Sequence, residues 1–171
     1  RNTEYEFGTN PCSEIMLRNR EFCNLSEVVV RATDTRTSLL EKVRLATILG
    51  TFQSTLINFK YVSAAWRKNC EEERLLGVSL TGIMDCKVTN GKDAGLEKLL
   101  DELREQAIKT NEEFAKKIGI NQSVAVTCVK PSGTVSQLVD AASGIHARHN
   151  PYYVRTVRGD KKDPLTKMMT D

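Results

Sequence analysis

Three side chains that can do chemistry occupy alternate positions near the start of the sequence. They are the amide of Asn10, the thiol of Cys12 and the carboxylate of Glu14. In an extended chain, alternate side chains share one face and lie about 6.6 Å apart. Such a row could contact a single substrate of the size of a ribose. A polar strand edge followed by a buried cysteine would explain the same pattern, since a free cysteine is usually a small core residue.

A second thiol, Cys23, follows the first. We expect a hairpin whose two strands are residues 12–17 and 22–30, joined by a polar turn. Depending on where the turn centres, Cys23 faces either Cys12 or Glu14 across the hairpin. Either register places two thiols near a carboxylate, an arrangement that suits redox or radical chemistry better than packing alone.

A loop of small and hydroxyl-bearing residues follows a strand-like pattern at residues 123–129. It reads Lys-Pro-Ser-Gly-Thr-Val-Ser over residues 130–136. Small residues allow a ligand to approach the backbone, and free N–H groups at a helix start bind phosphate. The spacing of a Walker A loop is absent, and an ordinary capped turn would have a similar composition. The candidate phosphate-binding residues are Ser132, Gly133, Thr134, Val135 and Ser136.

The remaining polar and sulfur-containing residues are assigned simpler roles. His146 and His149 lie in a polar segment, where a solvated surface is more typical than a metal site, because no carboxylate or cysteine completes a ligand set. Asp85 and the acidic run at residues 71–73 are interpreted as solvated groups. The other cysteines are assigned to packing: Cys70, Cys86 and Cys128. No metal site is therefore predicted.

Helical patterns separate the strand-like segments. A capping box at Ser38 predicts a helix over residues 38–57, and a weaker pattern covers residues 64–75. Apolar residues with a period near 3.6 predict a long amphipathic helix over residues 94–118, which Gly119 would end. Long helical crossovers between strands are typical of parallel pairing, so the order predicts an α/β fold.

Composition limits the class of protein. The 171 residues carry 25 Lys and Arg and 22 Asp and Glu, a formal charge of +3, and their length suits one domain with no internal boundary over 1–171. The basic residues are dispersed, so no nucleic-acid polymer is expected as a partner. The 27% of charged residues and the lack of an apolar run long enough to span a bilayer argue against a membrane protein. Five cysteines without a C-x-x-C motif, and a polar start without a signal peptide, predict a cytoplasmic protein.

Taken together, these motifs resemble the catalytic core of a ribonucleotide reductase. Asn-Pro-Cys-Ser-Glu-Ile at 10–15 resembles the active-site loop of that family, and Phe-Cys-Asn-Leu-Ser at 22–26 resembles the following strand. Leu-Gly-Val-Ser-Leu-Thr-Gly-Ile-Met-Asp at 76–85 resembles a core motif. Pro-Ser-Gly-Thr-Val-Ser at 131–136 resembles the substrate-phosphate loop, which Ser-Gly-Ile-His at 143–146 continues. The resemblance covers nearly the whole chain in the order of the family.

The resemblance is strongest to the adenosylcobalamin-dependent (class II) enzymes of the monomeric, triphosphate-reducing type. It implies part of a ten-stranded α/β barrel, with an active-site loop at residues 8–17 at its centre and a phosphate loop at residues 130–137. The implied reaction reduces ribonucleoside tri- or diphosphates to 2′-deoxyribonucleotides for DNA synthesis. Adenosylcobalamin would be the cofactor and a thioredoxin-type protein the reductant.

The same resemblance implies roles for single residues. Cys12 would become a thiyl radical that removes the 3′ hydrogen of the ribose, and Glu14 would be the general base on the 3′ hydroxyl. Asn10 would hydrogen-bond the substrate. Cys23 would supply a reducing equivalent while the 2′ hydroxyl leaves as water.

The sequence departs from the family pattern in one respect. In the family, the second redox cysteine lies upstream of the active-site loop, whereas no cysteine precedes Cys12 here. The C-terminal relay cysteines and much of the barrel are also missing. We therefore expect an internal fragment that has no activity alone.

Three alternatives stay open at the level of sequence. One is a class I large subunit, which reduces diphosphates and depends on a separate di-metal subunit. Another is a non-catalytic nucleotide-binding module that uses only the loop at 132–136. A third is a thiol–disulfide oxidoreductase that uses Cys12 and Cys23, although it would lack the usual C-x-x-C motif.

Overall fold

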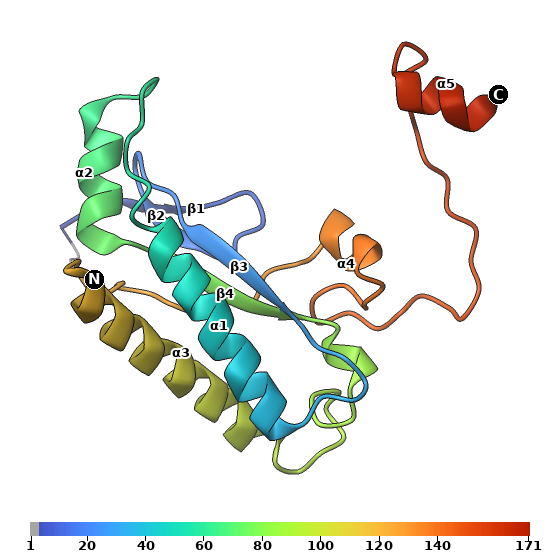
Figure 1. Ribbon diagram of the computed structural model, residues 1–171, viewed down its shortest axis with the longest axis horizontal. Coiled ribbons are helices and arrows are strands. Elements are labelled where there is room, and N and C mark those ends of the chain that lie inside the picture. Colours follow the sequence, from blue (N-terminus) through green and yellow to red (C-terminus); the bar gives the residue numbers. More distant parts are fainter. Residues whose placement is uncertain (1–3) are drawn as a thin grey trace.

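A short parallel sheet forms the centre of the computed structural model, which describes residues 4–171 (Figure 1). Strand β3 (Asn24–Val29) pairs in parallel with β4 (Leu76–Thr81). On the other side of β4, Val78 forms a single parallel bridge with Thr127. The strand predicted at residues 123–129 is thus present only as this bridge and its flanking hydrogen bonds.

Three helices follow the predicted pattern closely. They are α1 (Arg36–Gln53), α2 (Ala64–Glu73) and α3 (Leu96–Ile118). Helix α1 begins earlier than predicted, because its N-cap is Thr35. Ser38 is the third helical residue and completes the capping box from there. Gly119 ends α3 in the left-handed conformation, with a φ of 71°, as predicted.

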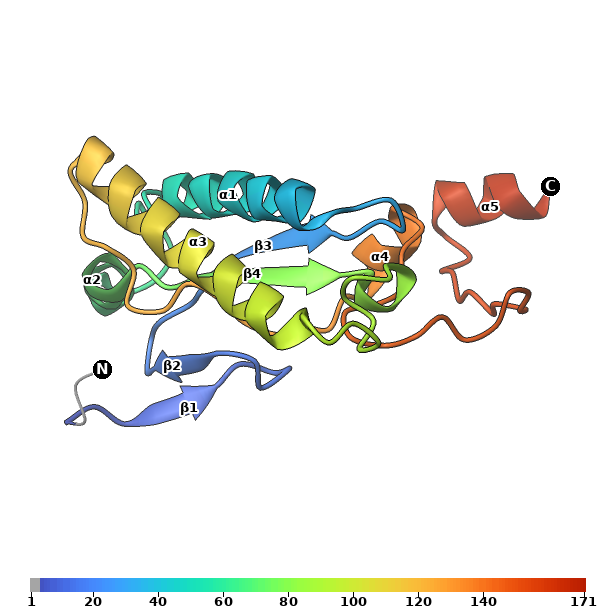
Figure 2. The same ribbon diagram turned by 90° about the horizontal axis from the view of Figure 1, so that it is seen from below.

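Helices α1 and α3 lie side by side over one face of the sheet (Figures 1 and 2). Alternate side chains of the strands point toward these helices, because successive residues of a strand face opposite sides. The core between the two layers contains Val28, Val30, Leu39, Val43, Leu76, Val78, Leu99, Leu103 and Ala107. The other face of the sheet carries Gly77, with Leu25 and two sulfur-containing side chains close to it.

A separate antiparallel hairpin lies on that other face (Figure 2). It consists of β1 (Phe7–Thr9) and β2 (Met16–Arg18). The predicted hairpin between residues 12–17 and 22–30 is wrong. The valine-rich part of β3 needs an apolar partner layer, and pairing with β4 beneath α1 and α3 supplies one.

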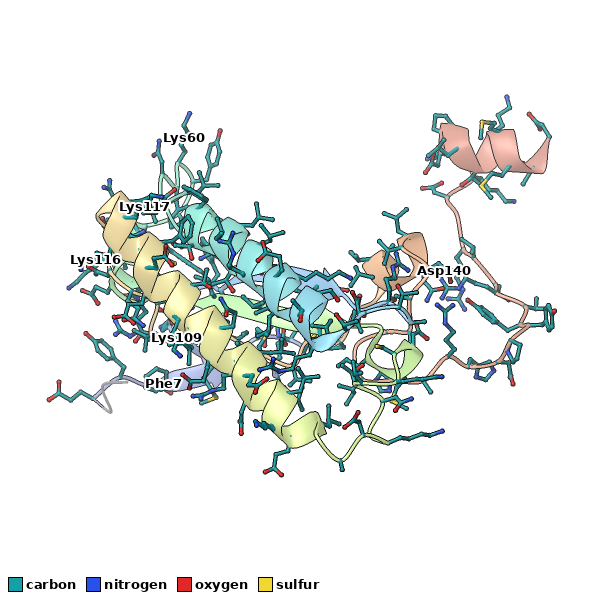
Figure 3. The ribbon with its side chains drawn as sticks, turned by 60° about the horizontal axis from the view of Figure 1, so that its bottom comes forward. Phe7, Lys60, Lys109, Lys116, Lys117 and Asp140 are labelled. Carbon is teal, nitrogen blue, oxygen red and sulfur yellow. The ribbon has the colours of Figure 1, made fainter. Side chains whose placement is uncertain are left out.

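Short elements follow the carboxyl ends of the parallel strands. The 3-10 helix η1 (Ile83–Asp85) comes after β4, and α4 (Thr134–Leu138) comes after the bridge at Thr127. Beyond residue 150 the chain extends away to α5 (Pro164–Thr170), and its side chains project into solvent (Figures 1 and 3). The described residues contain two small sheets and no closed barrel. None of their helices is both long and apolar enough to cross a membrane.

Two acidic side chains that were interpreted as solvated are instead part of ion pairs. Glu73 is 2% exposed and lies 2.5 Å from the guanidinium of Arg18, which connects α2 to β2. Asp85 accepts two hydrogen bonds from Arg148, at 3.0 and 3.1 Å, and one from the backbone of Ala142 at 2.8 Å. Sequence distance concealed both partners, because each pair joins residues more than fifty positions apart.

Candidate active site

The loop between β1 and β2 contains the predicted Asn-x-Cys-x-Glu motif. Asn10 shapes this loop: its side-chain oxygen accepts a hydrogen bond from the backbone of Ile15 at 3.2 Å, and its backbone carbonyl accepts one from Ser13 at 2.9 Å. Ser13 adopts a positive φ of 61°. The chain therefore turns instead of running extended, so that Cys12 is exposed while the Glu14 side chain is only 1% exposed.

One lysine brings the thiol and the carboxylate together. The ammonium of Lys130 donates a hydrogen bond of 2.8 Å to Oε1 of Glu14 and lies 3.9 Å from the sulfur of Cys12. Lys130 was placed in the phosphate loop by the sequence analysis but was not predicted as a site residue. Its position directly after a strand end, beside the hydroxyl-rich loop, was the available signal.

The environment of Glu14 favours the ionised carboxylate. Burial by itself raises the pKa of Glu14, but the hydrogen bond and charge of Lys130 outweigh it, helped by the Glu14 backbone amide and the Asn10 side chain. The net pKa lies below its ordinary value. The second oxygen, Oε2, is buried and has no hydrogen-bond partner of good geometry. It is therefore an acceptor available to a hydroxyl group of a ligand.

Two further thiols lie on the same face of the sheet, on either side of Gly77. A Cβ atom built on Gly77 would lie 3.0 Å from the sulfur of Cys128 and 3.2 Å from that of Cys23. Cys128 was assigned to packing, and the structure adds that its sulfur lies close to Gly77, as that of Cys23 does. The signal was its position in the strand-like pattern that leads into the phosphate loop.

Both thiols are held in the protonated form. Burial, together with the neighbouring Cys128 and Glu14, raises the pKa of Cys23 to about 12. Burial also raises the pKa of Cys128 to about 11, again with the help of Glu14. At neutral pH these groups are therefore hydrogen donors and weak nucleophiles, because the thiolate is the nucleophilic form.

The sheet keeps these two thiols from forming a disulfide without a rearrangement. Cys23 precedes β3 and Cys128 follows the bridge at Thr127, so that β4 runs between them. Two strand spacings separate their Cα atoms by about 10 Å. A disulfide requires a separation below about 7 Å.

In the predicted phosphate loop, some side chains hydrogen-bond within the protein and others are exposed to solvent. The hydroxyl of Ser132 donates to Glu27 of β3 at 2.7 Å, and that of the buried Ser136 donates to the loop carbonyl of Ser132 at 3.1 Å. These two hydroxyls hold the loop in shape. Residues 133–135 are exposed at the start of α4, whose N-cap has no side-chain hydrogen bond. The first N–H groups of a helix have no partner within the helix, so those at the start of α4 can bind a ligand.

The Ser-Gly-Ile-His motif packs on the end of β4. The hydroxyl of Thr81 accepts a hydrogen bond from the backbone of Gly144 at 2.8 Å and donates one to the carbonyl of Ala142 at 3.0 Å. The hydroxyl of Ser143 donates a hydrogen bond to the carbonyl of Ser132, so the motif also holds the phosphate loop. His146 and His149 are both exposed, as expected for solvated groups.

Several curated proteins with a similar sequence carry the same name. The adenosylcobalamin-dependent ribonucleoside-triphosphate reductase of Lactobacillus acidophilus is 32% identical over 92% of this chain and 24% of its own length. The enzyme of the same name from Lactobacillus delbrueckii subsp. bulgaricus is 29% identical, with the same coverage. No protein-family model matches the sequence.

The fold agrees with the sequence relatives. The crystal structure of a B12-dependent (class II) ribonucleotide reductase superposes on 83% of this chain and 23% of that chain, with a TM-score of 0.66 and 30% sequence identity. This chain is a homologue of class II ribonucleotide reductases. It spans about a quarter of the length of the curated relatives that it matches. The class II resemblance predicted from the motifs is confirmed, and the α/β character agrees with the class II structure.

Within this class II homologue, Gly77 makes room for the two thiols. We expect Gly77→Ala to lower the free energy of unfolding by about 1–3 kcal/mol, because overpacking a tight site strains its neighbours. The added methyl would lie 2.5 Å from Leu25, besides crowding Cys23 and Cys128. Gly8→Ala is the matched control, since nothing lies within 4 Å of its Cβ position. Urea unfolding of both variants tests this, and equal stabilities would contradict the close packing.

Proposed function

We propose that this chain is the part of an adenosylcobalamin-dependent ribonucleotide reductase that binds the ribonucleotide and carries two of its reacting thiols. The observation that supports this most directly is the contact of one lysine with both Cys12 and Glu14. It places an exposed thiol beside an ionised carboxylate, with the phosphate loop starting at the same residue. The names of the relatives supply the reaction class.

Cys12 is the proposed site of the thiyl radical. Its sulfur is exposed at the tip of the loop, where a ribose can approach it. Glu14 is the proposed base for the 3′ hydroxyl, because Oε2 is a buried acceptor without a partner and the carboxylate is held ionised. Asn10 is proposed to hydrogen-bond the substrate from the same loop, beside Glu14, whose carboxylate its side chain also contacts.

Cys23 is the proposed reductant near the ribose. Replacing the 2′ hydroxyl by hydrogen releases water and takes two electrons and two protons from two thiols, which leaves a disulfide. A buried thiol with a raised pKa keeps its hydrogen until the reaction removes it. The partner that would share the disulfide with Cys23 is assigned to no described residue, and a thioredoxin-type protein is the proposed external reductant.

The cofactor would supply the radical that Cys12 receives. An exposed thiol fits that role chemically, because its hydrogen can be removed without moving other groups. Among residues 4–171, the His, Cys, Asp and Glu side chains form no cluster of three that could hold a metal ion. We assign cofactor binding to none of the described residues and propose that this segment contributes the substrate side of the site.

The phosphates of the substrate are proposed to bind at residues 132–136. Residues 133–135 are exposed at the start of α4, where backbone N–H groups without a helical partner suit phosphate oxygens. Ser132 and Ser136 shape the loop from inside. A triphosphate is the proposed substrate because the relatives are named as triphosphate reductases.

An anaerobic assay of the full-length protein that contains this segment tests the proposal. We expect a ribonucleoside triphosphate to be reduced in the presence of adenosylcobalamin and a dithiol, without a second subunit. Formation of the 2′-deoxynucleotide is measured by chromatography. No product under these conditions, together with activity restored by a di-metal partner protein, would contradict the proposed cofactor.

A further inference from the structure

Lys130 is the polar connection between two loops that lie far apart in the sequence. Its ammonium contacts Glu14 at 2.8 Å and Cys12 at 3.9 Å, across 116 and 118 residues of chain. It is also the first residue of the phosphate loop at 130–137. One charged group of that loop therefore contacts both side chains.

The contact uses one of the two oxygens of Glu14 and leaves the other available. Lys130 binds Oε1, whereas Oε2 is buried without a partner. Anchoring the carboxylate through Oε1 restricts the directions in which Oε2 can point. Lys130 itself is only partly covered, with 26% of its side chain exposed.

We propose that Lys130 is a positioning residue for the proposed ribonucleotide reduction, which fixes the ionised carboxylate of Glu14 beside the Cys12 thiol and couples both to the phosphate loop. This positioning role rests on the proposed function. The experiment must therefore distinguish a failure of the positioning role from a failure of the proposed function. The role differs from that of Glu14 and Cys12, because Lys130 acts through them and its contacts are to protein atoms.

The charge of Lys130 also sets the pH range over which Glu14 can act as a base. Titratable groups from three segments face the carboxylate: Lys130, Cys12, Cys23 and Cys128, with Glu21 close to Cys23. Burial alone raises the pKa of Glu14, and Lys130 is the main opposing influence. Without it the pKa rises, so that the carboxylate is protonated, and activity is lost, at a higher pH than in the wild type.

Three variants of the full-length protein separate charge from hydrogen bonding. Lys130→Met removes both, Lys130→Gln keeps a donor without a charge, and Lys130→Arg keeps both. We expect kcat to fall by about 10- to 100-fold in the methionine variant, the usual effect of losing a charged hydrogen bond. The acidic limb of the pH–rate profile moves to higher pH in the methionine and glutamine variants, and stays near its wild-type position in the arginine variant.

Hydrogen–deuterium exchange of the protein without cofactor gives a readout that does not depend on activity. We expect faster exchange at residues 10–15 in Lys130→Met, and exchange near the wild-type rate in Lys130→Arg. Lys109→Met is the matched control, because Lys109 is exposed on α3 (Figure 3). It leaves both the exchange and the pH profile unchanged.

The outcomes are distinguishable. An inactive wild-type protein would refute the proposed function, while altered exchange in Lys130→Met would still support the positioning role. An active wild type with the same acidic limb and the same exchange in all three Lys130 variants would overturn the inference. If Lys130→Met fails to fold, the comparison of Lys130→Gln with Lys130→Arg decides, and identical acidic limbs in these two would overturn it.

Discussion

Cys12→Ala is expected to abolish ribonucleotide reduction by the full-length protein without unfolding it. The sulfur is exposed, and the loop that bears it is held by hydrogen bonds of Asn10 to Ser13 and Ile15, none of which involves the thiol. Alanine has no group that can take up or return a hydrogen atom. We expect turnover to fall by at least about a thousandfold, as for other residues that react directly.

A cysteine on the opposite side of the sheet provides the control. Cys86 is 1% exposed in the core beneath α1 and α3, and Cys86→Ala removes a thiol without touching the site. Its expected effect is a small loss of stability with little change in kcat. Turnover is measured as deoxynucleotide formed under saturating substrate, and folding by circular dichroism.

The result also separates the alternatives that the sequence leaves open. A nucleotide-binding module without catalysis would lose no function in Cys12→Ala, and its affinity for a nucleotide would stay unchanged. A reductase would retain nucleotide affinity and lose turnover. Substantial residual reduction in a correctly folded Cys12→Ala variant would contradict the assignment of Cys12 as the reacting thiol.

The elements that could be predicted are those whose cause is local. The period of Leu99, Leu103 and Ala107 predicts α3, and the preference of glycine for a positive φ predicts its end at Gly119. The capping box near Ser38 indicates the start of α1, although both Thr35 and Ser38 can cap and sequence alone does not choose between them. Helix signals act between residues a few positions apart, so helices can be predicted without knowledge of the tertiary fold.

Strand pairing could not be predicted in the same way, because its cause is not local. Residues 22–30 carry a strand pattern, but β4 is their partner about fifty residues away, and the short link through residues 18–20 suggested a hairpin instead. The loop at residues 10–15 turns because β1 and β2 pair around it. An alternating pattern that is interrupted by such a turn no longer places its side chains on one face.

The sequence identified only the part of the candidate site whose residues lie close together along the chain. Cys12, Glu14 and Cys23 are close in sequence, so their motifs identified them before their positions were known. Lys130 and Cys128 join the site only through the parallel arrangement that follows β4. Their contribution depends on tertiary contacts that composition and spacing do not encode.

Glu14→Gln is the second substitution with a large expected effect. Glutamine has nearly the same shape but cannot accept a proton at neutral pH, so we expect kcat to fall by about 10²- to 10⁴-fold, the usual contribution of a general base. Substrate affinity should change much less, because the phosphate loop is untouched. Steady-state kinetics of the full-length protein measure both quantities. Glu41→Gln, at an exposed position of α1, is the control.

The same substitution has a signature in stability that depends on pH. The pKa of Glu14 in the folded protein lies below its ordinary value, so ionisation stabilises the fold above that ordinary value and the benefit is lost as the pH falls through the folded-state pKa. Glu14→Gln lacks this contribution and also leaves Lys130 without its carboxylate partner. The wild type should therefore be more stable than Glu14→Gln at neutral pH, and the difference should shrink in acid. Urea unfolding at both pH values measures it, and a difference that grows in acid would show that Glu14 is protonated in the folded protein and cannot act as the base.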